Sequence, residues 1–139
     1  MAQLKIDTGI VEYDLNDAVT VRFNPTDADF IERLYTTFSG LDKKQEEINA
    51  SMNKVKTNAE VFDLARKYDA EMRDMINGLF ESDICTPLFG KTNVYALASG
   101  CPLWFNLLMV IMDEIDTSVT AQHKAKNPRI EKYIKKYHK

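Results

Sequence analysis

The sequence predicts an α+β fold, mainly α, in which an N-terminal β-hairpin or meander packs on a bundle of about four helices. Apolar residues alternate within residues 3–23, as they do in short strands. Longer stretches after residue 26 carry apolar residues at helical spacing, and residues 103–112 are apolar at every position but Asn106. A chain of 139 residues with 45% apolar residues suits one domain with its own core.

We therefore expect a single domain over residues 1–139, with three parts. Residues 1–23 form the hairpin or meander, residues 24–120 the helical core, and residues 121–139 a basic C-terminal helix or tail.

The N-terminal part shows period-2 spacing, with turns expected at residues 7–9 and 16–17. Its apolar positions are Leu4, Ile6, Ile10, Val11, Tyr13, Leu15, Val19, Val21 and Phe23. Such a small sheet is marginal alone, so its apolar face must rest on the helices or on a neighbouring subunit. Its open edge is a place where another chain could add a strand.

The first helix is expected to begin after Pro25, with Thr26 or Asp27 as its cap. Its apolar face is made by Phe30, Leu34, Phe38 and Leu41. Ser39-Gly40 is a candidate kink or end. Residues 42–56 are mostly polar, so the helix could continue there as an exposed arm.

A second helix is expected after a cap at Thr57 or Asn58. Its apolar residues are Val61, Ala65, Tyr68, Met72, Met75 and Leu79. Residues 78–90 then predict a compact connector, and residues 93–98 another helical turn.

The stretch 93–116 contains the only Trp and is expected to hold the central helix of the core. Its apolar run is too short for the roughly 20 residues that span a bilayer, and acidic residues follow at once. We expect Trp104, Leu108 and Ile111 in the core. The acids at 113, 114 and 116 are expected in solvent, where basic residues at 66, 67 and 73 could pair with them.

No sequence motif indicates catalysis. The five glycines form no phosphate-binding loop, and neither GxSxG nor HExxH occurs. Cys85 and Cys101 have no partners at metal-ligand spacing, so we expect both to be small, buried apolar residues. We predict no enzyme activity, no catalytic residues, no cofactor and no metal site. The absence of a signal segment at the N-terminus predicts a cytoplasmic protein without membrane contact.

The net charge of −3 conceals an asymmetry. Residues 121–139 carry six Lys, one Arg and one Glu, a net +6, which leaves −9 for residues 1–120. A basic tail can contact nucleic acid or an acidic partner, but terminal lysines are more commonly just solvated. The tail lacks the interleaved arginines and aromatic platform of single-strand binders, so nucleic acid is not the partner we expect.

Three segments carry a family resemblance: FNPTDADF (23–30), ARKYDAEMRDMI (65–76) and NVYALASGCPLWFNLLMVIMDEID (93–116). In these the chain resembles a family of small proteins from the tail region of tailed phages and prophages of Gram-positive bacteria. Their genes lie between the tail-tube and tape-measure genes, the place of the tail assembly chaperone. The resemblance covers nearly the whole chain and brings no catalytic residues with it.

The resemblance implies a non-enzymatic tail assembly chaperone in the host cytoplasm, with the tape-measure and tail-tube proteins as partners. We also expect it to form a homo-oligomer. One alternative is a structural virion component, such as a tail completion or head-tail joining subunit. Another is a small nucleic-acid-binding regulator that uses the basic tail.

A chaperone of this kind needs apolar surface, an accessible strand edge and charged arms. We therefore predict partner contacts on three surfaces: a strand edge, an aromatic helix face and the basic tail. The candidate residues are Val19, Val21 and Phe23 on the strand, Tyr35 and Phe38 on the helix, and Lys132, Lys135 and Lys136 in the tail.

Overall fold

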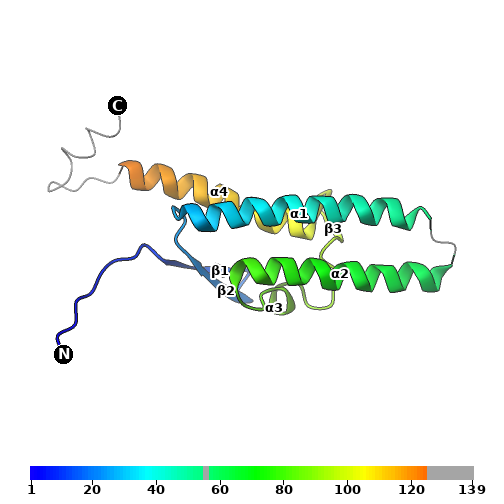
Figure 1. Cartoon of the computed structure of the whole chain (residues 1–139), viewed down its shortest axis with the longest axis horizontal. Helices are drawn as coiled ribbons and strands as arrows, with labels where there is room; N and C mark the ends of the chain where they lie inside the picture. The colour runs from blue at the N-terminus through cyan, green and yellow to red at the C-terminus, as the bar shows by residue number, and fades with distance from the viewer. Residues whose placement is uncertain (55–56, 125–139) are drawn as a thin grey trace.

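A computed structural model shows an N-terminal β-hairpin followed by four helices, which confirms the predicted mainly α fold with a small β part (Figure 1). It describes residues 1–54 and 57–124. Three long helices lie side by side, and the hairpin crosses one end of them. In order, the elements are β1 (Val11–Leu15), β2 (Val19–Phe23), α1 (Ala28–Met52), α2 (Asn58–Phe80), α3 (Cys85–Phe89), β3 (Leu97–Ala98), β4 (Cys101–Pro102) and α4 (Leu103–Lys124).

The hairpin pairs β1 with β2 antiparallel, from Val11 opposite Phe23 to Leu15 opposite Val19. Its turn is at the expected place, because Asn16 and Asp17 both adopt a φ of 56° and the Ala18 N–H donates to Leu15 O. Short polar side chains tolerate this left-handed conformation, which matches the twist of paired strands.

Of the two expected forms of the N-terminal sheet, the hairpin is present and the three-stranded meander is not, since residues 1–10 form no strand. The expected turn at residues 7–9 does form, with Gly9 at a φ of +71° and its N–H bonded to Asp7 Oδ1. The chain before that turn runs away from the helices (Figure 1).

α1 and α2 form an antiparallel helical hairpin (Figure 1). Asp27 caps α1, and Thr57 caps α2 by accepting from the Glu60 N–H, as the sequence indicated. α1 does not end at Gly40. A Cβ there would come within 2.5 Å of Met75 Cε, the end of a flexible side chain of α2, so this glycine leaves room for that methyl group.

The second half of α1 is not the exposed arm that its polar composition suggested. Ile48 is buried, and the Ser51 hydroxyl lies 3.0 Å from the Tyr68 hydroxyl of α2. A few apolar positions are sufficient here, because α2 covers only one side of the helix.

Between α2 and α4 the chain is more folded than expected. The helical turn predicted for residues 93–98 is wrong, because residues 93–96 form a non-helical turn, closed by the bond from the Ala96 N–H to Asn93 O, and residues 97–98 form a strand. The two-residue strands β3 and β4 then pair around Ser99 and Gly100, both with positive φ. No sequence pattern indicated this second hairpin.

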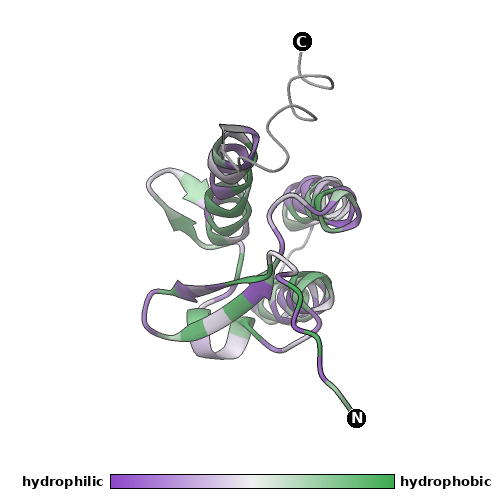
Figure 2. Ribbon diagram, turned by 90° about the vertical axis from the view of Figure 1, so that its left-hand side faces the viewer, coloured by the Kyte–Doolittle hydropathy of each residue, from purple (hydrophilic) through white to green (hydrophobic). Residues whose placement is uncertain are grey.

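α4 is the central core helix that the sequence predicted. Trp104 is only 2% exposed, and Leu108 and Ile111 are buried with it. Trp104 packs edge-on against Phe38 of α1, and its indole N–H donates to Gln45 Oε1 at 3.1 Å. Figure 2, a view along the helices, shows α4 beside α1 and above the hairpin.

The predicted pairing of basic residues on α2 with the acids of α4 is wrong. Arg66 pairs with Asp63, and Arg73 pairs with Asp69, all on α2 itself. Partners three or four residues away on one helix already lie within reach of the guanidinium group.

The basic tail expected at residues 121–139 lies mostly outside the described residues, since α4 is described as far as Lys124. None of the helices in residues 1–54 and 57–124 combines the length and apolar composition needed to cross a membrane.

Candidate functional site

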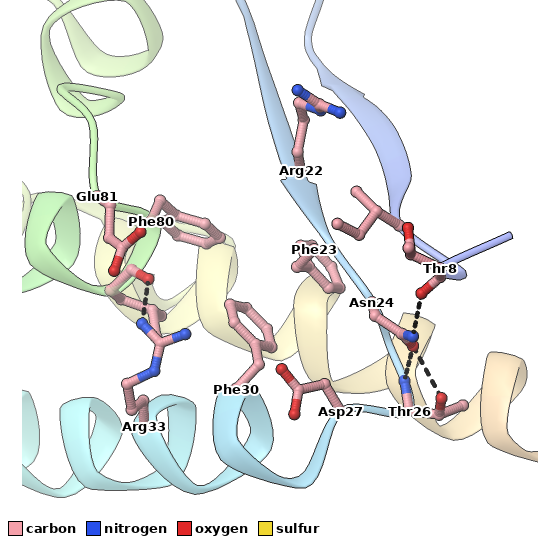
Figure 3. Close-up of a pocket in the computed structure, with 12 residues that line it drawn as sticks. Thr8, Arg22, Phe23, Asn24, Thr26, Asp27, Phe30, Arg33, Phe80 and Glu81 are labelled. Atoms are coloured by element: carbon pink, nitrogen blue, oxygen red, sulfur yellow. Dashed lines mark hydrogen bonds between the residues drawn. The ribbon is translucent and has the colours of Figure 1, made fainter. Parts of the chain in front are cut away.

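A cavity of about 420 Å³ lies where the end of β2 faces the start of α1 and the end of α2 (Figure 3). We call it the β2 groove. Its lining residues come from four segments of the chain: Thr8, Ile10, Arg22, Phe23, Asn24, Thr26, Asp27, Phe30, Arg33, Leu79, Phe80 and Glu81.

Asn24 organises one wall of the β2 groove. Its side-chain amide donates to Thr8 O at 2.9 Å, and its Oδ1 accepts from the Thr26 N–H at 2.9 Å and the Thr26 hydroxyl at 2.8 Å. The three bonds tie the N-terminal segment to the loop between β2 and α1 (Figure 3). Pro25 cannot donate a backbone hydrogen bond, so the Asn24 side chain supplies the order in this turn.

The floor of the β2 groove is aromatic. The ring centroids of Phe23 and Phe30 are 4.4 Å apart and stacked, Phe30 lies 6.1 Å from Phe80, and Tyr13 stacks on the far side of Phe23 at 4.8 Å. These rings come from β1, β2, α1 and α2. The row therefore joins the hairpin to the helices and gives the groove a rigid apolar base.

Two arginines border the groove, and both are paired. Arg33 Nε lies 3.1 Å from Asp29 Oδ2, and its Nη1 donates to Leu79 O at 3.2 Å. Its guanidinium also lies 5.7 Å from the Phe30 ring centre. Arg22 pairs across the hairpin with Glu12. The rim is thus polar and nearly balanced in charge, so it favours hydrogen bonding over attraction to a strongly charged ligand.

β2 has one strand neighbour, β1, and no other backbone partner of residues 19–23 is found in the described parts of the chain. Its second edge therefore offers free N–H and C=O groups next to the groove. An extended segment of another protein can hydrogen-bond to such an edge while its side chains enter neighbouring pockets.

The structure separates the candidate strand and helix residues into different environments. Val21 and Phe23 are buried and Val19 is half-buried, so β2 offers a partner mainly its backbone edge, and of these three side chains only Phe23 lines the β2 groove. Tyr35 is exposed, whereas Phe38 is half-buried against Trp104 and Phe105. Tyr35 and Phe38 do not line the β2 groove.

The candidate residues Lys132, Lys135 and Lys136 lie outside the described residues.

Asn24, Arg33 and Phe80 shape the groove, although no sequence pattern predicted a role for them. The one local signal was Asn24 immediately before Pro25, a pair that favours an ordered turn. Arg33 and Phe80 become neighbours only because α1 and α2 pack side by side, which no local pattern reveals.

Among the residues that the structure describes, His, Cys, Asp and Glu side chains nowhere gather in the groups of three that could hold a metal ion. Cys85 is buried, and this burial raises the pKa of its thiol to about 12, so it is protonated at neutral pH and a poor nucleophile. Cys101 is half-exposed, and both cysteines are free thiols.

Comparisons of the chain with protein-family models, with curated proteins and with solved structures gave no match. We therefore argue its function from the β2 groove and from the sequence.

Proposed function

We propose that the protein is a non-enzymatic assembly factor of bacteriophage or prophage tails, a chaperone that binds the tape-measure and tail-tube proteins. Two observations support the proposal. The three segments named above resemble a family encoded at the chaperone position of tail gene clusters. The open edge of β2 beside an aromatic groove is the feature that carries the binding role.

A chaperone of this kind must hold segments of a long partner before they assemble. Backbone hydrogen bonds to a strand edge bind extended chain with little regard for its sequence, and an apolar groove adds affinity for occasional large side chains. The β2 edge supplies the backbone hydrogen bonds. The aromatic floor of Phe23, Phe30 and Phe80 supplies the apolar contact.

Co-expression of this protein with its proposed partner, a phage tape-measure protein, followed by pull-down, tests the proposal. We expect a complex with the wild-type protein. Ile10→Asp places a charge on the exposed rim of the groove and should lower recovery about tenfold, the equivalent of one buried apolar contact.

The matched control is Phe62→Asp, which adds the same charge at an exposed apolar position on α2 that does not line the groove. Its recovery should equal that of the wild type. If the wild-type protein forms no complex with the tape-measure protein under any condition, the proposal is wrong. If both variants reduced recovery of the complex equally, the β2 groove would not be the binding site.

Mass spectrometry of purified phage particles distinguishes a chaperone from a structural virion component. A chaperone leaves before the tail is complete, so its peptides should be absent from mature particles. Recovery of the protein in stoichiometric amounts would favour a tail completion or head-tail joining subunit instead.

A further inference from the structure

Residues 1–6, which precede the turn at residues 7–9, form an extended arm that projects from the folded body in both views (Figure 1 and Figure 2). Its apolar side chains are uncovered, with Leu4 91% and Ile6 81% exposed. In extended chain, residues two apart point to the same side, so Leu4 and Ile6 present one apolar edge. Such an edge costs solvation free energy as long as nothing covers it.

The base of this arm is fixed in direction. Thr8 O accepts from the Asn24 amide, and Gly9 lies so close to the same side chain that a Cβ there would be 2.7 Å from Asn24 Nδ2. The Asp7 carboxylate also closes a turn onto the Gly9 N–H. Folding the arm back along its own hairpin would require these contacts to break.

A second cavity, about 270 Å³, lies at the other end of the hairpin, between the β1–β2 turn, α3 and α4. We call it the α4 groove. Two asparagines contribute to it, and its other lining residues are all apolar: Leu15, Leu88, Phe89, Leu103, Leu107 and Val110. Val110 is 59% exposed, so this apolar surface is open to solvent.

We propose that the arm of one copy of this chain occupies the α4 groove of a second copy. The groove is slightly smaller than the roughly 300–1,000 Å³ of small-molecule sites, which suits a pair of aliphatic side chains such as Leu4 and Ile6. The two surfaces also match in polarity, because Leu4 and Ile6 lie on one side of the arm and six of the eight residues that line the groove are apolar.

The donor and acceptor surfaces are different parts of the molecule, so the contact is head-to-tail. Two copies can exchange arms in a closed dimer, or each copy can pass its arm to the next in a ring or an open chain. This self-association goes beyond the tail-assembly role and does not depend on it.

Sedimentation equilibrium of the full chain tests the proposal. The mass of the wild-type protein should rise above the monomer value of 16.0 kDa with concentration, within a range up to about 500 μM that covers weak affinities. The arm variant Leu4→Asp/Ile6→Asp and the groove variant Val110→Asp should each remain monomeric. Phe62→Asp, at an apolar position with the same exposed fraction of 59% as Val110, should associate like the wild type.

Mixing the two variants is the decisive step. The arm variant keeps an intact groove and the groove variant keeps an intact arm, so an equimolar mixture should form one-to-one dimers and nothing larger. A mixture that stays monomeric would show that the intact arm does not bind the intact groove and would overturn the proposal. A wild-type protein that is monomeric throughout, or an oligomer that both variants leave unchanged, would overturn it as well.

Discussion

Arg73 should be a major source of stability, because it joins α2 to the loop that leads into the second hairpin. Its Nε lies 3.0 Å from Asp69 Oδ2, and its Nη2 donates to Gly90 O at 2.8 Å and to Thr92 O at 2.7 Å. Asp69 in turn accepts from the Val94 N–H at 2.8 Å. Replacing Arg73 with Met keeps the length of the apolar stem and removes the donors.

The side chain of Arg73 is only 17% exposed, so water cannot fully replace these bonds. Hydrogen bonds to charged groups contribute about 1.5–3 kcal/mol each, and partial solvent access reduces this to about 1 kcal/mol. Three lost bonds then lower the free energy of unfolding by about 3 kcal/mol. For 139 residues, an unfolding entropy of about 2.1 cal/mol/K per residue converts this to a fall in Tm of about 10 °C.

Urea unfolding followed by circular dichroism and by Trp104 fluorescence measures the change, since the only Trp is buried and reports on the core. Arg66→Met is the control, because Arg66 also pairs with an acid on α2 but lies in solvent. It should alter stability by less than about 0.5 kcal/mol. A result for Arg73→Met within 0.5 kcal/mol of this control would refute our account of how the loop is held.

Three further predictions concern the core, a helix cap and the thiols. Leu108→Ala should cost about 2–5 kcal/mol, because the side chain is fully buried, whereas the same change at exposed Leu97 should be close to neutral; urea unfolding compares the two. Thr57→Ala removes the cap of α2 and should cost about 1 kcal/mol, and Thr57→Ser should restore it. At pH 8 a thiol reagent should label Cys101 well before Cys85, whose raised pKa of about 12 and burial leave little thiolate; equal labelling rates would contradict this.

Local patterns predicted the main elements well. The Thr57 cap, the Asn16–Asp17 turn and the buried position of Trp104 are all confirmed. Caps and turns depend on residues within a few positions of one another, and a helix apolar on nearly all sides must be covered wherever it lies.

The same patterns were misleading where the outcome depended on distant partners. Leu4 and Ile6 alternate like a strand, yet a strand forms only where another backbone pairs with it. The polar second half of α1 looked exposed, yet α2 packs against it. Ser39-Gly40 looked like an interruption, yet Gly40 lies where Met75 comes close.

The sequence by itself determined which segments become helices and strands, where most of them begin, and which helix lies at the centre of the core. Only the tertiary structure decided which surfaces remain open. The β2 groove needs Arg33 to bond to Leu79 O, 46 positions away, and the α4 groove needs the hairpin turn placed beside α3 and α4. Side-chain periodicity records which face of an element is apolar, but it does not record which distant element covers that face.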